Sequence, residues 1–176
     1  MELEEIRLLA MAKLNLTLDI RGRRADGYHE IETVMQSVTL ADTVRLHRTG
    51  SGRLELRCSD SALPAGPENL AWRAAEAFFR AAGRSNSGIA MEIRKEIPAG
   101  AGLAGGSADA AAVLAGLDCL LDTHCGRERL CAVGASLGAD IPFCLTGGTC
   151  LARGKGERLE PVPALPACEI VVAKPA

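Results

Sequence analysis

The chain has 176 residues, of which 48% are hydrophobic and 24% charged, and its formal net charge is −2. This length fits one domain, or one domain with part of a second, and can enclose a sizeable core. There is no long basic block, so we expect no nucleic-acid partner. The acidic start lacks the order of a signal peptide, and no apolar run approaches the roughly 18 residues of a membrane helix. We therefore expect a soluble, cytoplasmic protein that does not bind membranes.

The chain contains seven cysteines, an odd number. None forms a C-x-x-C pair, and no pair of histidines accompanies them at the spacing of a zinc site. The adjacent His124 and Cys125 are most simply interpreted as a solvated pair. We interpret the cysteines as buried thiols of a protein in a reducing compartment rather than as metal ligands.

The first predicted elements are two strands around a turn. Apolar and polar residues alternate over residues 14–20, which predicts a half-buried strand with Lys13 and Asn15 on its polar side. A solvated sheet face would explain this polar side by itself. The glycines and the Asp-Gly pair of residues 21–29 predict a turn, and residues 30–38 predict a second strand.

The next segments predict both strands and a helix. Alternating residues at 43–47 and 54–58 predict two short strands, and the glycine-containing segment between them predicts a hairpin. Asn69 is a suitable N-cap for a helix that Gly83 ends. A further strand is predicted to begin at residue 89, so the chain mixes both types of element.

The glycine-rich segment 97–109 lies between that strand and an alanine-rich helix. Glycine permits positive φ and lets the backbone come close to a ligand. The start of the following helix offers unpaired N–H groups and a positive dipole end, which together favour an anion and most often a phosphate. An ordinary strand-to-helix loop is the alternative, but four glycines followed by Ser107 at a helix start favour phosphate.

Two familiar phosphate loops match this segment poorly. Gly100, Gly102 and Gly105 fit the dinucleotide pattern G-x-G-x-x-G, which also needs a second parallel strand ending in an acidic residue about 20 residues further on. Asp118 and Asp122 fall near that distance, but within or at the end of the predicted helix. The Gly-Lys-Ser/Thr of a Walker A loop is absent. The segment therefore indicates another class of nucleotide loop.

Asp140 lies in an unusual position. It follows a third predicted helix, residues 127–137, and precedes an apolar run, so its carboxylate would lack the stabilisation that a helix N-terminus provides. Two interpretations of Asp140 stay open: it either forms a turn or acts as a functional acid. Further on, residues 147–157 predict a strand and a turn, and residues 169–173 predict a last strand.

Three separated stretches of the chain resemble one family. The residues that carry the resemblance are 12–18 with 23–36, then 97–112, and finally 137–143 with 147–148 and 154–157. The glycine-rich segment resembles the nucleotide loop of the galactokinase, homoserine kinase, mevalonate kinase and phosphomevalonate kinase (GHMP) superfamily. The Asp-Gly-Tyr-His sequence at residues 26–29 narrows the resemblance to the 4-diphosphocytidyl-2-C-methyl-D-erythritol kinase family.

The resemblance implies a fold and a reaction. The implied fold is α+β, of the ribosomal protein S5 domain 2-like type. Residues 1–165 would form the ATP- and substrate-binding N-terminal domain, and residues 166–176 the first strand leading into a second domain that this sequence lacks. The implied reaction is ATP-dependent phosphorylation of the 2-hydroxyl of a cytidine-diphosphate-linked methylerythritol in non-mevalonate isoprenoid synthesis. Mg²⁺ is expected with ATP, held largely by phosphate oxygens.

The resemblance also implies roles for individual residues. Asp140 matches the catalytic aspartate that accepts the hydroxyl proton, and Lys13 matches the lysine that supports it. Tyr28 and His29 match residues that hold the cytosine, and Asn15 is expected beside Lys13 near the substrate. The residues that match the ATP site are Asn69, Pro98, Gly100, Gly102, Leu103, Ala104, Gly105, Gly106 and Ser107.

The chain departs from the family pattern at two positions. Ala104 and Ala108 stand where many relatives carry Gly and Ser, and Ala108 lacks a hydroxyl that could contact phosphate. Both residues are small, so we expect little effect. Two alternatives to this kinase stay open. One is a non-catalytic nucleotide-binding module, and the other is a different small-molecule kinase of the superfamily, of the homoserine or mevalonate kinase type.

Overall fold

The computed structural model describes residues 3–25, 27–86 and 88–174. These ranges contain seven strands and four helices. The strands are β1 (Glu5–Asn15), β2 (Asp19–Arg23), β3 (His29–Arg48), β4 (Leu54–Cys58), β5 (Ile89–Arg94), β6 (Thr149–Gly154) and β7 (Arg158–Pro161). The helices are α1 (Leu70–Ala82), α2 (Gly105–Leu120), α3 (Arg127–Ala135) and α4 (Ile141–Thr146). None of these helices is both long and apolar enough to cross a membrane.

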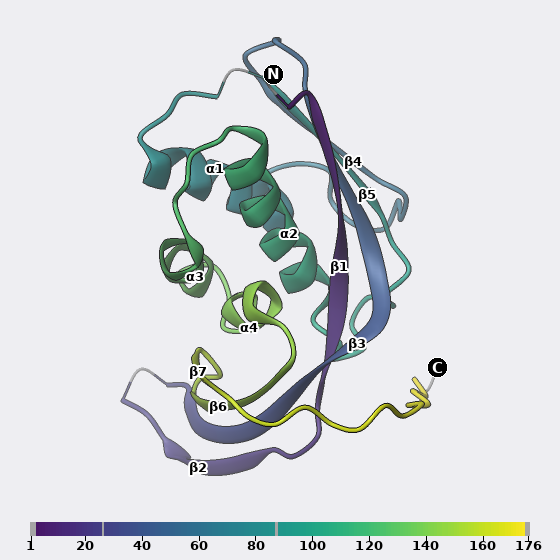
Figure 1. Cartoon of the computed structure of the whole chain (residues 1–176), viewed down its shortest axis with the longest axis vertical. Helices are drawn as coiled ribbons and strands as arrows, with labels where there is room; N and C mark the ends of the chain where they lie inside the picture. The colour runs from purple at the N-terminus through teal and green to yellow at the C-terminus, as the bar shows by residue number, and fades with distance from the viewer. Residues whose placement is uncertain (1–2, 26, 87, 175–176) are drawn as a thin grey trace.

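All the strands belong to one sheet that is built around β3. The order is β4-β5-β3-β6-β7, and β1 and β2 also pair with β3. The four helices lie on one face of this sheet (Figure 1). The largest side chains buried between the helices and the sheet include Leu46, Phe78, Met91, Leu114 and Leu117. The predicted α+β class is therefore confirmed.

β3 is irregular at one point, and the irregularity matters for the site. Met11 of β1 lies opposite Ala41, whereas Lys13 lies opposite Ser37, so β3 carries extra residues there and bulges. Beside this bulge, the N–H of Lys13 donates to the carbonyl oxygen of Leu103 at 3.1 Å. β1 is thereby joined to the glycine-rich segment.

The hairpin predicted from residues 43–47 and 54–58 is wrong, although both segments are strands. β5 lies between them, antiparallel to β3 and parallel to β4. A parallel pair needs a crossover connection, and α1 provides it. The predicted limits of α1 are confirmed, because Asn69 accepts the N–H of Ala71 at 2.9 Å and Gly83 ends the helix with φ of 64°.

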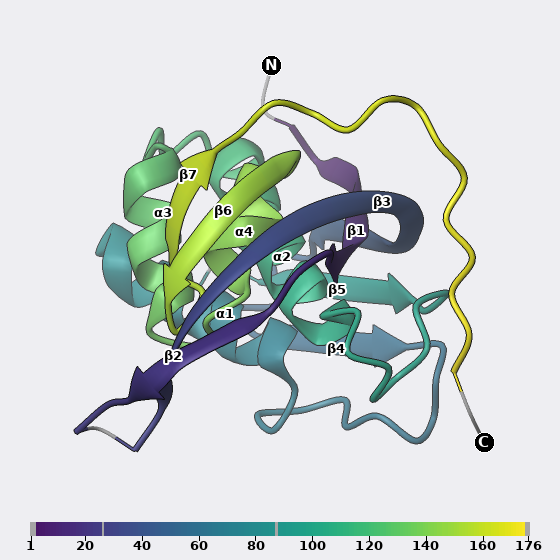
Figure 2. The ribbon, with the colours of Figure 1, turned by 90° about the horizontal axis from the view of Figure 1, so that it is seen from below.

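The single strand predicted for residues 14–20 is also wrong. β1 ends at Asn15 and β2 begins at Asp19, and each pairs with β3. Leu16, Leu18 and Ile20 are exposed rather than half-buried. β2 lies beyond the helices (Figure 2), so the apolar side chains of this region have no helical layer on which to pack.

All seven cysteines are free thiols. Cys150 is buried as predicted and four cysteines are half-buried, but Cys119 and Cys168 are exposed, so the prediction of buried thiols is wrong for these two. Cys119 lies on the outer side of α2, where neighbouring Leu120 already faces the core, and Cys168 lies in the segment that follows β7.

The strand predicted for residues 169–173 is absent from the structure. Residues 162–174 are irregular and run along the outside of the molecule after β7 (Figure 2). The N–H of Val162 still donates to the carbonyl oxygen of Thr149 in β6, but no described strand pairs with residues 169–173. The division predicted between two domains stays a prediction, and the first two and last two residues of the chain lie outside the described ranges.

Candidate active site

The glycine-rich segment connects β5 to α2 through several left-handed residues. Gly100 and Gly102 have φ of 66° and 74°, which glycine adopts without strain. Ala104, with φ of 58°, is the N-cap residue of α2 and makes no side-chain capping hydrogen bond. Since alanine cannot cap, the N–H groups of the first turn of α2 are left for another partner.

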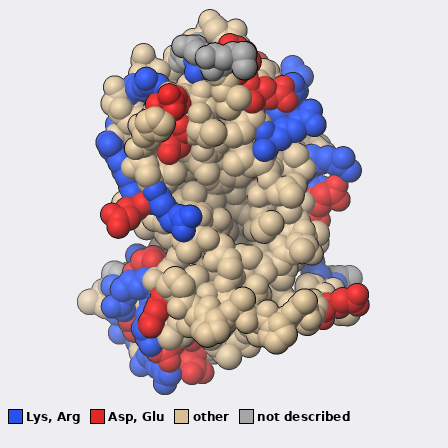
Figure 3. Space-filling view, in the orientation of Figure 1, with Lys and Arg blue, Asp and Glu red and all other residues tan. Residues whose placement is uncertain are grey.

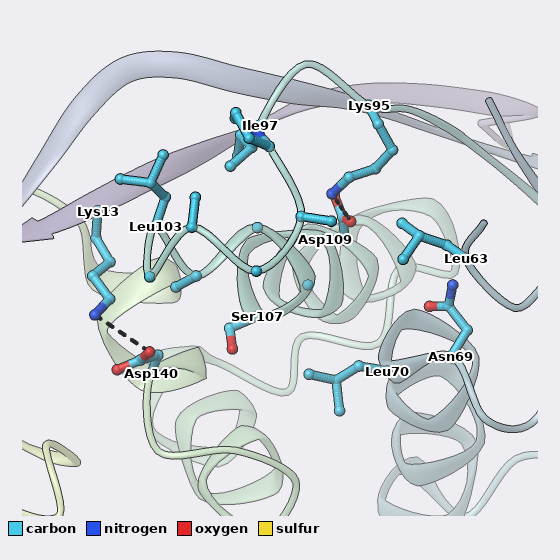
Figure 4. A pocket seen from close by; sticks show the side chains of 18 of the residues that line it. Lys13, Leu63, Asn69, Leu70, Lys95, Ile97, Leu103, Ser107, Asp109 and Asp140 are labelled. Atoms are coloured by element: carbon cyan, nitrogen blue, oxygen red, sulfur yellow. Dashed lines mark hydrogen bonds and ion pairs between the residues drawn. The ribbon is translucent and has the colours of Figure 1, made fainter. Parts of the chain in front are cut away.

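This segment forms the wall of a cavity of about 540 Å³ (Figure 4). All the residues that the resemblance assigns to ATP line this cavity, and so do Lys13 and Asp140. Lys13 and Asp140 lie at one end of it, and Leu63 and Asn69 lie at the other (Figure 4). The fold therefore brings the predicted catalytic and ATP residues together from distant parts of the chain.

Lys13 and Asp140 meet directly. The Nζ of Lys13 lies 3.5 Å from Oδ2 of Asp140 and donates to Oδ1 of Asn15 at 3.0 Å. The Lys13 side chain is 7% exposed, whereas that of Asp140 is 31% exposed. A buried ammonium thus faces a carboxylate that a ligand can reach. Such a pair can orient a hydroxyl group and accept its proton.

Asp140 is the N-cap residue of α4, so the expectation that it lacks a helix N-terminus is wrong. The apolar run after it forms a short helix, because Pro142 suits the first turn and Ile141 and Phe143 are buried in the core. The Asp140 carboxylate makes no capping hydrogen bond but lies beside the positive end of this helix. Cys144 of α4 is no competing base, since burial raises the pKa of its thiol to about 12.

A second lysine cluster lies beneath the glycine-rich segment. Lys95 Nζ donates to Asp42 and also to Oδ2 of Asp109, the latter at 2.7 Å. The Asp42 carboxylate also accepts the backbone N–H groups of Glu96 and Ile97 at 2.6 and 2.8 Å. All three charged side chains are buried. One ammonium therefore joins β3, the start of the glycine-rich segment and α2.

No sequence motif indicated this cluster, although the alternation along β3 contains a signal for it. Asp42 occupies the same face of the strand as Val44 and Leu46, which are fully buried. An acidic residue therefore stands at a core position, where a carboxylate needs a cation or N–H donors. Lys95, directly before the glycine-rich segment, supplies that cation.

Tyr28 and His29 do not line the cavity. Both are exposed, and they lie at the turn from β2 into β3, where Lys155 Nζ is 4.6 Å from the centroid of the Tyr28 ring. β2 and the start of β3 form a hairpin that projects from the body of the molecule (Figure 2). Charged side chains of both signs gather over this hairpin (Figure 3). Asp26 of the same motif lies outside the described residues. The structure thus leaves the predicted cytosine-binding pair apart from the catalytic pair.

Within the described ranges, no group of three or more Asp, Glu, His or Cys side chains is arranged to hold a metal ion. Magnesium commonly binds through one or two protein carboxylates together with substrate phosphates and water. The side chains present therefore build no metal cage of their own, and we assign no catalytic step to a protein-bound metal.

The fold and the cavity define a class of protein. Residues 69–148, which include α1, the glycine-rich segment and Asp140, match the family described as GHMP kinases N terminal domain. This segment of the chain is thus similar to the N-terminal domain of GHMP kinases. A solved homoserine kinase from Cytophaga hutchinsonii shares the fold, with a TM-score of 0.70 at 20% identity over 91% of this chain and 53% of that chain.

Relatives of higher sequence identity all carry the name of one kinase. The 4-diphosphocytidyl-2-C-methyl-D-erythritol kinase of Pelotomaculum thermopropionicum is 48% identical over 170 residues, which are 97% of this chain and 59% of that protein. A crystal structure of 4-(cytidine 5′-diphospho)-2C-methyl-D-erythritol kinase matches with a TM-score of 0.78 at 45% identity, over 92% of this chain and 56% of that chain. The resemblance seen in the motifs is confirmed. The chain spans little more than half the length of these relatives.

Proposed function

We propose that the protein containing this chain transfers the γ-phosphoryl group of ATP to the 2-hydroxyl of 4-diphosphocytidyl-2-C-methyl-D-erythritol, a step of non-mevalonate isoprenoid synthesis. The observation that carries the proposal is the Lys13–Asp140 pair at one end of a cavity walled by the glycine-rich segment. The names of the relatives support the identity of the acceptor.

In this proposal Asp140 is the base. Phosphoryl transfer depends mainly on positioning and electrostatic stabilisation, so a base and a cation cover much of the protein's contribution. Asp140 accepts the proton of the 2-hydroxyl as that oxygen bonds to the γ-phosphorus, and the bond from that phosphorus to the β–γ bridging oxygen of ATP breaks. Lys13, 3.5 Å away, orients the carboxylate and offsets the negative charge that develops.

The glycine-rich segment binds the phosphates. The first-turn N–H groups of α2 and the positive end of its dipole favour an anion at this place. Because Ala104 provides no side-chain cap, these N–H groups are available to phosphate oxygens. Magnesium that arrives with ATP shields the phosphate charge, while the chain's own groups bind and orient the nucleotide.

Tyr28 and His29 recognise the cytosine. The exposed Tyr28 ring can stack on a base, and the His29 ring nitrogens can hydrogen-bond to its edge. Both residues lie outside the cavity that contains Asp140. The substrate would therefore extend from Asp140 to the hairpin, and its diphosphate linker provides length for that span.

The acceptor can be tested with a substrate panel. The complete protein is incubated with ATP and with the cytidine substrate, homoserine or mevalonate, and the products are followed by phosphorus NMR. We expect phosphorylation of the cytidine substrate alone. Phosphorylation of homoserine or mevalonate in its place would contradict the proposed acceptor. Binding of ATP and the cytidine substrate without turnover would favour a non-catalytic nucleotide-binding module.

The cytosine contact is tested by Tyr28→Ala. Because base–aromatic stacking is worth about 1–3 kcal/mol, we expect KM for the cytidine substrate to rise about tenfold or more, with a smaller change in kcat. Tyr28→Phe keeps the ring and should keep the wild-type KM. If Tyr28→Ala leaves KM unchanged in steady-state kinetics, Tyr28 does not bind the base.

A further inference from the structure

The cluster beneath the glycine-rich segment is unbalanced in charge. One ammonium, that of Lys95, faces the carboxyl groups of Asp42 and Asp109, and all three side chains are buried. A buried ion pair is tolerated, but an additional carboxylate without its own counter-charge is strongly disfavoured in an environment of low dielectric constant. The cluster is therefore most stable when one carboxyl group carries a proton.

The hydrogen bonds indicate which carboxyl group holds that proton. Asp42 accepts hydrogen bonds from Lys95 and from the N–H groups of Glu96 and Ile97, and these donors stabilise its ionised form. Asp109 accepts from Lys95 through Oδ2, while its Oδ1 is buried and has no hydrogen-bond partner in the described part of the chain. Asp109 is thus the less stabilised anion.

Asp109 also borders the nucleotide cavity. It is only 4% exposed, yet it lines the cavity together with Lys95 (Figure 4). A Cβ atom placed on Gly105 would lie 3.3 Å from the Lys95 ammonium, so the cluster touches the backbone at the start of α2. Two other titratable groups interact electrostatically with Asp109. They are the Asp42 carboxyl group of β3 and the protonated Cys144 thiol of α4.

We propose that Asp109 takes up a proton when nucleotide binds, so that the site holds ATP most tightly with Asp109 neutral. The proposal rests on the nucleotide binding proposed above. Phosphate oxygens entering the cavity bring negative charge toward an unbalanced carboxylate, and protonation removes that repulsion. The proton comes from solvent and forms an O–H bond on the Asp109 carboxyl group, with no other bond made or broken.

The linkage has a definite sign. Burial raises the pKa of Asp109 to about 7, and Lys95 opposes this rise while the neighbouring Asp42 carboxylate adds to it. Below this pKa the proton is already present, and above it binding must draw a proton from solution. Nucleotide affinity therefore falls as the pH rises above about 7. The Asp109→Asn side chain resembles the neutral carboxyl group and needs no proton.

The test is calorimetric titration of the complete protein with the magnesium complex of a non-hydrolysable ATP analogue between about pH 6 and about pH 8.5. We expect the wild type to lose up to about tenfold in affinity per pH unit above its midpoint. Asp109→Asn should show a nearly flat profile and bind about tenfold more tightly than the wild type near pH 8. Titration of the analogue's own phosphates is common to both proteins and cancels in the ratio of their dissociation constants.

Asp118→Asn is the matched control, because Asp118 lies on the same helix but outside the cavity, and it should keep the wild-type pH profile. A second measurement detects proton uptake by the wild type directly: the binding enthalpy is compared in two buffers of different ionisation enthalpy near pH 8. At this pH the analogue's phosphates, with a pKa of about 6, are already ionised and take up no proton. Equal profiles for wild type and Asp109→Asn, or no proton uptake, would overturn this inference alone. Failure of the wild type to bind the analogue at any pH would overturn it together with the proposed function.

Discussion

The two lysine clusters beside the glycine-rich segment differ in charge balance and in access. Lys13 and Asp140 form a pair of one cation and one anion, and the Asp140 carboxylate is partly exposed to the cavity. Lys95 lies between two carboxyl groups, and each of the three side chains of this cluster is at most 8% exposed. The same residue types therefore stand in two different environments within one site.

This difference distinguishes a pair of residues that can take part in the reaction from a cluster that stabilises the fold around the site. A carboxylate that takes a proton from a substrate must be reachable, and that of Asp140 is. A cluster that joins three elements must be buried and hydrogen-bonded, as Asp42 is by Lys95 and by two backbone N–H groups. Substitution of the partly exposed Asp140 should therefore change turnover more than stability, and substitution of the buried Asp42 should do the reverse.

The largest expected effect comes from Asp140→Asn. Loss of the base should lower kcat by about 10³-fold or more. The free energy of unfolding should fall by only about 1 kcal/mol, because Asp140 is partly exposed and Asn15 still accepts a hydrogen bond from the Lys13 ammonium. Steady-state kinetics and urea unfolding measure the two quantities. Retained turnover would contradict the role of Asp140, and Asp122→Asn, at an exposed site, is the control.

Lys13→Met tests whether Lys13 and Asp140 act as a unit. The single variant should lower kcat about 100-fold through lost electrostatic stabilisation. The double variant Lys13→Met/Asp140→Asn should be scarcely slower than Asp140→Asn alone, because groups that act together give non-additive losses. Fully additive losses in kcat would show that the two residues work independently.

The next largest effect is expected for Asp42→Asn, this time on stability. Breaking one partner of a buried, hydrogen-bonded ion pair should lower the free energy of unfolding by about 3 kcal/mol, measured in urea near neutral pH. Asp109→Asn is the matched variant, because it leaves Lys95 and Asp42 as a balanced pair and should cost little. A greater loss from Asp109→Asn than from Asp42→Asn would reverse the assignment of charge within the cluster.

A smaller effect is expected in the pH dependence of stability. The folded pKa of Asp109, about 7, exceeds the ordinary value, so the folded state binds the extra proton between about pH 4 and about pH 7. The stability that protonation of Asp109 contributes to the folded state is complete below about pH 4 and is lost as the pH rises through about 7. Asp109→Asn should therefore gain about 2 to 3 kcal/mol relative to wild type between about pH 5 and about pH 8 in urea unfolding, because each pH unit below the folded pKa is worth about 1.4 kcal/mol. A difference independent of pH would contradict this prediction.

The smallest expected effect concerns Ala104. Its φ of 58° and ψ of 31° place a side chain in the left-handed region, so Ala104→Gly should stabilise the protein by about 1 kcal/mol. Ala108→Gly, four residues further in the interior of α2, should instead destabilise it by about 1 kcal/mol. Thermal unfolding of both variants measures the contrast. A lower Tm for Ala104→Gly would show that this backbone carries no such strain.

Local signals predicted much of the fold and of the site. Asn69 and Gly83 marked the ends of α1 because caps depend on neighbouring residues. The glycine-rich segment indicated a phosphate site because its glycines and the helix start lie together in the chain. Motif resemblance then selected Lys13 and Asp140, whose meeting at 3.5 Å no local pattern could establish.

The errors arose where distant segments decide the structure. The pairing of β4 depends on β5, which comes more than thirty residues later, so the apparent hairpin was misleading. The alternation over residues 14–20 indicated that one face of a strand is apolar, but it could not show whether other elements pack on that face. Asp140 lies at the N-terminus of α4 because Ile141 and Phe143, the residues that begin this helix, pack into a core formed by other elements. The Lys95 cluster likewise depends on the register that places Asp42 beneath α2.

The position of β5 between β3 and β4 also sets the order in which the sheet can assemble during synthesis. β1, β2 and β3 are consecutive and antiparallel, so they can pair as soon as they leave the ribosome, whereas β4 must wait for residues 89–94. The early ribbon carries Lys13 and Asp42 before Asp140 and Lys95 have been made. The helices that cover this face come later in the chain, so these two charges can stay in water until their counter-ions have been made.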